Sequence, residues 1–157
     1  DDMSFYVRNT ECTDKTNAPA GHSALYILVP VTNLEADIDW EKEKDRYTEL
    51  LIDTVMKKTV MKDLREHIKA QKVITPADWK DEYNVYNGAT FNLAHNYGQM
   101  LYFRPHNEFE EVKNVYLTGG GTHPGSGLPT IYESGRISAN MICKKHGVEF
   151  ESHNPFV

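Results

Sequence analysis

The feature that most constrains the fold is a glycine-rich segment at residues 114–139, NVYLTGGGTHPGSGLPTIYESGRISA. Five glycines occur within the nine residues from Gly119 to Gly127. The short apolar run before them, Val115-Tyr116-Leu117, is typical of a buried strand. From Thr130 onward the residues are helix formers with apolar spacing. The segment therefore predicts a strand, a tight loop and a helix in that order.

A loop of this kind suits a ligand that carries phosphate groups or a flavin. Glycine has no Cβ, so backbone N–H groups can approach a ligand closely and the chain can adopt positive φ. The N-terminus of the following helix presents unpaired N–H groups and partial positive charge. The loop is not a P-loop, because Leu128 and Pro129 follow Gly127 where that motif has Lys and Ser/Thr. It also lacks the dinucleotide fingerprint, because Thr130 stands where G-x-G-x-x-G needs its third glycine.

The segment GGGTHPGSGLPTIYESGRISA resembles the C-terminal signature of the bacterial- and archaeal-type phytoene desaturases, which are FAD-dependent carotenoid desaturases. Three more segments resemble parts of that family in the same order: NTECTDKTNAPAGHSALYILVPV, ITPADW and NGATFNLAHNYGQMLYFRPHN. The resemblance runs from Ser4 to about Met141. It implies that the chain is the C-terminal part of a longer flavoprotein. The N-terminal dinucleotide-binding part, with its GxGxxG loop, is then missing here.

The resemblance also implies the fold class and the cofactor. It predicts an α+β or α/β fold, the C-terminal portion of a two-domain FAD-dependent oxidoreductase. Residues 1–110 would belong to a substrate domain with a mixed sheet. Residues 111–145 would supply the last strand and helix of the FAD-binding domain, and residues 146–157 a tail. The residues implied to bind FAD are Gly119, Gly120, Gly121, Thr122, His123, Gly125, Ser126, Gly127, Leu128 and Pro129.

Within the family, the loop segment 125–129 lies at the flavin ring, and the segment 119–122 passes the diphosphate and ribityl chain. Four residues are implied to line an apolar tunnel for a long polyene substrate: Phe91, Leu93, Met100 and Tyr102. Ordinary core packing is the alternative for each of these four. His123 could donate to the flavin or remove a proton, and its alternative is to brace the turn. No catalytic residue is assigned, because the family's proposed acid–base residues lie mainly in the missing part.

The rest of the chain predicts a mixture of strands and helices. Thr75, Pro76 and Asp78 form a helix-start signal, and Asn87-Gly88 is a turn signal. Glu133 and Arg136 are expected to pair along the last helix. Strands are expected at residues 4–8, 23–31 and 72–74, and the strand at 23–31 is expected to be central in the sheet. Helices are expected after Asp39, at residues 61–68 and after Thr75. A last helix is expected from Pro129 to a stop signal at residues 144–147.

Composition excludes several functional classes. The net charge is −6 with no basic run, which argues against a nucleic-acid partner. No apolar run approaches the roughly 20 residues of a membrane span. His95 and His106 match no common metal-ligand spacing, so no metal site is expected. Cys12 and Cys143 are expected to be free thiols of a reducing compartment, which indicates a cytoplasmic protein.

Three functions are consistent with these patterns. The first is the C-terminal part of a carotenoid desaturase that touches the membrane peripherally to reach its apolar substrate. The second is a related FAD oxidoreductase acting on another isoprenoid, such as a retinoid saturase or a polyene isomerase. The third is a non-catalytic ligand-binding or interaction fragment. In each case we expect the isolated 157-residue chain to be inactive, because the adenosine-binding half is missing.

Overall fold

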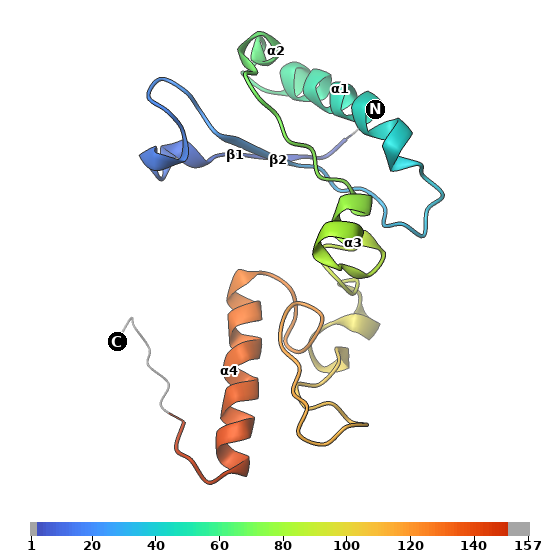
Figure 1. The fold of residues 1–157 in the computed structure, drawn as a ribbon, viewed down its shortest axis with the longest axis vertical. Helices are drawn as coiled ribbons and strands as arrows, with labels where there is room; N and C mark the ends of the chain where they lie inside the picture. Colours follow the sequence, from blue (N-terminus) through green and yellow to red (C-terminus); the bar gives the residue numbers. More distant parts are fainter. Residues whose placement is uncertain (1–2, 151–157) are drawn as a thin grey trace. The chain divides into compact units, whose positions relative to one another are not determined.

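The computed structural model describes residues 3–150, which form two compact units, one ending at Gly88 and the other starting at Ala89 (Figure 1). The described part combines helices, a two-stranded sheet and several short 3-10 turns, which confirms the mixed helix-and-sheet composition. Residues 151–157 of the predicted tail lie outside the described residues. None of the described helices is both long enough and apolar enough to cross a membrane.

The first unit contains a β-hairpin with a long connection. Strand β1 (Tyr6–Asn9) pairs antiparallel with β2 (Leu25–Leu28), with Tyr6 opposite Leu28 and Asn9 opposite Leu25. The connection carries two 3-10 turns, η1 (Thr10–Cys12) and η2 (Lys15–Asn17). Two neighbouring strands joined by a long connection were predicted, and this is confirmed. In the described residues β2 pairs only with β1, so the predicted central strand is an edge strand here, and the mixed sheet of the substrate domain stays a prediction.

Helix α1 (Trp40–Lys58) carries the apolar core of this unit. It begins where predicted, because the Asp39 side chain accepts the Lys42 N–H at 3.3 Å and so caps the helix. The hydrophobic core side chains Trp40, Ile52 and Val55 all belong to this helix, and Pro76 of a later helix is buried as well. Figure 1 shows α1 lying across the hairpin, and the Lys58 Nζ donates to the Met3 carbonyl at 3.1 Å.

The segment after α1 is less regular than its sequence suggests. Helix α2 (Leu64–His67) is a single turn, shorter than the predicted 61–68. It is tied to α1 by Arg65, which pairs with Glu49 and, at 2.6 Å, with Asp53. The strand predicted at 72–74 is wrong: no described strand pairs with these residues, and Ile74 is 39% exposed.

Helix α3 (Pro76–Tyr83) begins and ends at its local signals. Thr75 and Asp78 form a reciprocal capping box, with the Thr75 N–H donating to the Asp78 carboxylate at 2.7 Å. The rings of Trp79 and Tyr83 lie 4.8 Å apart on one face, as their spacing predicts. After α3 the chain turns through η3 (Tyr86–Gly88), where the predicted Asn87-Gly88 turn has φ of 49° and 63°.

Thr75→Ala is expected to lower the free energy of unfolding by about 1 kcal/mol through loss of the cap.

Hydrogen bonds from the Thr75 backbone N–H hold the pKa of Asp78 below its usual value of 3.8. A lowered folded-state pKa means that Asp78 stabilises the fold above about pH 4 and loses that effect as the pH falls through its folded pKa. Urea unfolding at about pH 7 and about pH 2.5 should therefore show a smaller acid-induced loss in Asp78→Asn than in the wild type. Equal losses in the two proteins would contradict a stabilising Asp78 carboxylate.

The second unit is built around helix α4 (Leu128–Lys145), which starts with Pro129 in its first turn and ends beside Gly147, as predicted. Before it come two 3-10 turns, η4 (Tyr97–Gln99) and η5 (Leu101–Phe103). The predicted buried strand at Val115–Leu117 is wrong. Only an isolated bridge forms there, between Glu108 and Tyr116, and Val115 is 39% exposed.

Candidate functional site

The glycine loop joins the Glu108–Tyr116 bridge to α4 through three glycines at positive φ. Gly119, Gly125 and Gly127 have φ of 108°, 146° and 104°, a region that residues with a Cβ rarely adopt. Gly127 is the N-cap of α4, and no side chain caps that helix end. The N-terminal N–H groups of α4 and their partial positive charge are therefore left for another acceptor.

Another segment approaches the loop most closely at Gly121, and the approach is looser at Gly125 and Gly120. A Cβ on Gly121 would lie 3.0 Å from the Asn92 side-chain oxygen, and one on Gly125 would lie 3.4 Å from the Arg104 Nε. On Gly120 it would lie 3.6 Å from Ser126, inside the loop itself. Close packing therefore restricts Gly121, whereas Gly119, Gly125 and Gly127 are favoured by their positive φ.

Thr122 and His123 hold the middle of the loop against the preceding segment. Thr122 is buried, and its hydroxyl donates to the Pro105 carbonyl at 2.6 Å. The His123 N–H donates to the same carbonyl at 2.9 Å, and its Nδ1 lies 2.9 Å from the Leu101 carbonyl. A carbonyl can only accept, so Nδ1 carries the proton in this contact. This is the contact expected if His123 braces the turn; a role toward a flavin stays a prediction.

A buried polar cluster fixes the start and the middle of the loop to α4. The Asn107 Nδ2 lies 3.1 Å from the His123 carbonyl and 3.3 Å from the hydroxyls of Ser134 and Ser138. The Ser138 hydroxyl donates to the Leu117 carbonyl at 2.7 Å, and the Gly119 N–H donates to the Ser134 hydroxyl at 3.1 Å. All three side chains are less than 5% exposed. The interior of this unit is therefore organised by hydrogen bonds around the loop.

Asn107→Leu is expected to lower the free energy of unfolding by about 3 kcal/mol, because it removes a buried amide donor and leaves the His123 carbonyl without the hydrogen bond from that amide. Asn17→Ala is a control, since the Asn17 amide makes only exposed hydrogen bonds, to the carbonyls of Thr10 and Asp14. That control should change stability by less than about 0.5 kcal/mol. Urea unfolding of the two variants tests the difference, and equal effects would show that the Asn107 cluster adds nothing beyond an exposed amide.

Arg104 lies beneath the loop with almost no solvent contact. It is 1% exposed; its Nη1 donates to the Gln99 carbonyl at 2.7 Å and its Nη2 to the Leu93 carbonyl at 3.3 Å. Its Nε is buried and has no hydrogen-bond partner in the described part of the chain. Sequence reasoning missed Arg104 and Asn107 as supports of the loop. The available signal was their place in FRPHN, a polar stretch directly after an aromatic run.

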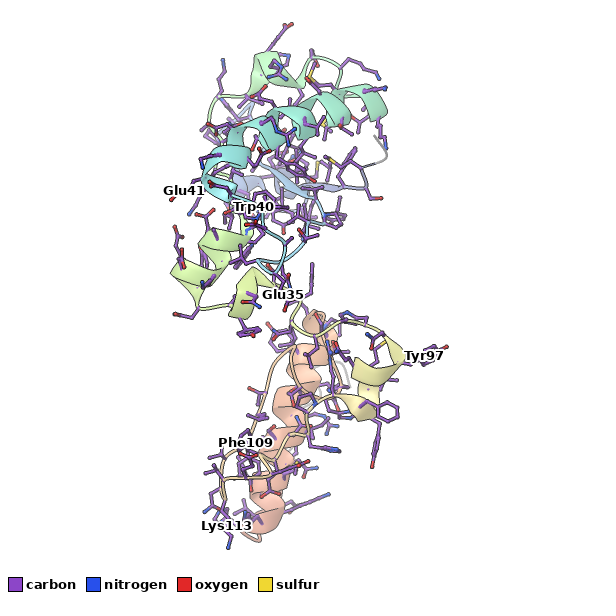
Figure 2. All side chains as sticks on the ribbon, turned by 90° about the vertical axis from the view of Figure 1, so that its right-hand side faces the viewer. Glu35, Trp40, Glu41, Tyr97, Phe109 and Lys113 are labelled. Atoms are coloured by element: carbon purple, nitrogen blue, oxygen red, sulfur yellow. The ribbon has the colours of Figure 1, made fainter. Side chains whose placement is uncertain are left out.

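The four candidate substrate-lining residues lie on the surface of this unit. Phe91 and Tyr102 are 58% and 72% exposed, and Leu93 and Met100 are each 36% exposed. Tyr97 beside them is 96% exposed, and Figure 2 shows it projecting away from the ribbon. A cavity of about 360 Å³ is found in the other unit and is lined largely by charged residues, among them Lys44, Lys72 and Glu82. The segment 91–103 therefore presents apolar surface that this unit leaves uncovered.

Glu133 and Arg136 form the predicted pair along α4, with Arg136 Nε donating to the Glu133 carboxylate at 2.8 Å. The hydrogen bond from Arg136 holds the pKa of Glu133 below its usual value. Cys12 is exposed and Cys143 half-buried, both as free thiols. In residues 3–150 no cluster of His, Cys, Asp and Glu side chains is arranged to hold a metal ion.

Comparison with known proteins shows relatives over nearly the whole chain. It is 54% identical over 151 residues to a 4,4'-diapophytoene desaturase (4,4'-diapolycopene-forming) of a Methylomonas species, covering 96% of this chain and 30% of the relative. It is 42% identical to an all-trans-zeta-carotene desaturase of Myxococcus xanthus, covering 94% of this chain and 28% of the relative. A neurosporene-forming phytoene desaturase of Rhodobacter capsulatus is 40% identical, and the match covers 90% of this chain and 27% of the relative. No protein-family model matches the chain. The chain thus spans less than a third of the length of these relatives, and the predicted resemblance is confirmed.

Proposed function

We propose that this chain, a homologue of the bacterial carotenoid desaturases, is the C-terminal part of a flavin-dependent desaturase of carotenoid biosynthesis. The complete protein would introduce double bonds into a long isoprenoid hydrocarbon by hydride transfer to FAD. The observation that carries the proposal is 54% identity over 151 residues to a diapophytoene desaturase. The activity belongs to the complete protein, because the matched relatives are more than three times as long as the matched segment.

The residues of the loop fit a flavin. Positive φ at Gly119, Gly125 and Gly127 turns the backbone so that N–H groups can face a ligand. The uncapped N-terminus of α4 supplies partial positive charge, and the buried Nε of Arg104 lacks an acceptor. When bound, FAD accepts the hydride that no side chain of the protein can accept. The residues of this chain would bind and orient FAD and would stabilise negative charge on the flavin ring.

Within the loop we assign two tasks. Residues 119–122 would pass the diphosphate and ribityl chain, where backbone N–H groups are good phosphate donors. Residues 125–129 would face the ring, so that the N-terminus of α4 is aimed at the atoms that gain negative charge on reduction. The hydrogen bonds from Asn107 and Thr122 would hold this backbone in place before the cofactor arrives.

The exposed apolar surface supports an apolar substrate and a longer protein. Phe91, Leu93, Met100 and Tyr102 would line the path of a polyene such as phytoene. The N-terminal dinucleotide-binding part would cover much of the surface that is exposed here. In this proposal residues 1–110 are the substrate-domain portion and residues 111–145 the FAD-binding portion. The complete protein would be cytoplasmic and would touch the membrane peripherally, where such a substrate dissolves.

We expect the 157-residue chain alone to bind FAD weakly or not at all, and the complete protein to bind it tightly. The reason is that this sequence has no G-x-G-x-x-G segment to hold the adenosine half. Calorimetric titration of both proteins with FAD measures the difference. Incubation of the complete protein with phytoene in lipid vesicles then tests the reaction, since each new conjugated double bond shifts the product absorbance to longer wavelength. A complete protein without flavin would overturn the proposed function, and tight binding by the short chain would overturn the division of the FAD site.

A further inference from the structure

Arg104 is a buried charge with only neutral partners. Its two described hydrogen bonds go to the backbone carbonyls of Leu93 and Gln99. Among residues 3–150 no carboxylate forms an ion pair with it, although its side chain is 1% exposed. A buried charge without a counter-charge is costly, so such groups are usually paired with an anion.

The unpaired Nε of this side chain lies close to the glycine loop. It would lie 3.4 Å from a Cβ on Gly125, two residues before the N-cap of α4. The N-terminus of α4 carries partial positive charge of its own and has no side-chain cap. A whole positive charge and a partial one therefore occur at the same short stretch of loop. These two positive charges repel each other, and an anion beside them would offset that repulsion, so the local electrostatics favour an anionic ligand.

We propose that Arg104 is the residue that stabilises the reduced, negatively charged flavin ring, acting through the loop at Gly125. This inference rests on the proposed function and adds to it the group that sets the reduction potential. Hydride transfer to the ring adds two electrons and one proton, so the ring gains one negative charge. Arg104 donates nothing covalently. Its charge lowers the free energy of the reduced state more than that of the neutral oxidised state.

The same positive charge could also serve the diphosphate of FAD, which is anionic in both redox states. The two sources of negative charge are distinguished by what changes when Arg104 is replaced. Contact with the ring predicts a shift in reduction potential. Contact with the diphosphate alone predicts weaker FAD binding with an unchanged potential, because both redox states would lose the same interaction.

The test compares three variants of the complete, FAD-loaded protein: Arg104→Gln, Arg104→Lys and Arg136→Gln. Their two-electron midpoint potentials are measured by equilibration with a reference dye. For Arg104→Gln we expect the preference for the reduced cofactor to fall about tenfold, which is about 30 mV toward negative potential. Arg104→Lys keeps the charge and should change the preference less than about twofold, or about 9 mV. Arg136→Gln removes an exposed charge already paired with Glu133 and should also change it less than about twofold.

Each outcome decides the matter. Arg104→Gln with bound FAD and an unchanged potential overturns the inference and leaves the proposed function intact. A shift of equal size in Arg104→Lys shows that the hydrogen bonds matter and the charge does not, which also overturns it. If Arg104→Gln does not fold, Arg104→Met, which also removes the charge but keeps an unbranched side chain, takes its place with the same expected shift. A complete protein that takes up no FAD overturns the proposed function and this inference together.

Discussion

Replacing Gly88 by alanine should lower the free energy of unfolding by about 4 kcal/mol or more, a large fraction of the stability of a small domain. A Cβ at this position would lie 2.1 Å from the carbonyl oxygen of Pro76 and 2.7 Å from its carbonyl carbon. Both are backbone atoms, and the capping box of Thr75 and Asp78 holds that end of α3. Gly88 also has φ of 63°, so alanine is strained there even without the clash. Urea unfolding followed by the fluorescence of Trp40 and Trp79, both in this unit, measures the loss.

Gly21→Ala provides the matched control for that result. Gly21 has φ of 76°, but a Cβ there would have no heavy atom within 4 Å. It therefore carries the backbone strain without the clash and should cost only about 1 kcal/mol. If both substitutions cost about the same, the close approach of Gly88 to Pro76 contributes nothing, and the packing described for the end of this unit is wrong.

The elements that the sequence predicts well are those whose boundaries are set by near neighbours. Asp39 caps α1, Thr75 and Asp78 cap α3, and Pro129 lies in the first turn of α4. In each case the side chain acts on N–H groups within three residues or fixes its own φ. Such interactions depend little on the rest of the fold, so a pattern of residue types is enough to locate them.

Strands are predicted less well, because a strand depends on a partner that can lie far away in the sequence. The residues at Val115–Leu117 and Lys72–Ile74 have the composition of strands, yet neither segment forms one. A strand is stabilised by a ladder with a second strand, and nothing within the segment specifies that partner. The pair that is correct, β1 with β2, is a hairpin of the same chain region, so its partner is near in sequence.

The candidate site likewise has a part that near neighbours in the sequence reveal and a part that depends on distant contacts. The loop itself is visible in the sequence as five closely spaced glycines before a helix start. The side chains that hold it are not, because Asn107 contacts Ser134 and Ser138 from 27 and 31 residues away. Arg104 reaches Gly125 across a similar gap. Spacing of 3.6 or 2 residues carries no information about such contacts, and only the folded chain brings these groups together.

Gly127→Val in the complete protein should reduce the FAD content by at least about tenfold. Gly127 has φ of 104° and ψ of 143°, close to a region that is essentially restricted to glycine and costs about 1–3 kcal/mol for other residues. A branched side chain would also stand at the N-cap of α4, where the loop is proposed to face the ring. Since about 1.4 kcal/mol is a tenfold change in affinity, the backbone strain alone accounts for this loss. The ratio of flavin to protein absorbance after purification measures it.

Two further substitutions separate a local effect on the cofactor from general unfolding. Gly135→Ala lies within α4 with no heavy atom within 4 Å of its Cβ, so it should retain full FAD and gain about 0.5–1 kcal/mol of stability. Gly127→Ala adds the strained φ without the branched side chain, and its FAD content should fall between those of Gly135→Ala and Gly127→Val. The Thr130 hydroxyl, which donates to the Ser126 carbonyl at 2.6 Å, should keep the loop folded in the alanine variant. Gly127→Val that purifies with full FAD content would remove the loop from the cofactor site, because a strained and crowded backbone could not then be the surface that the flavin contacts.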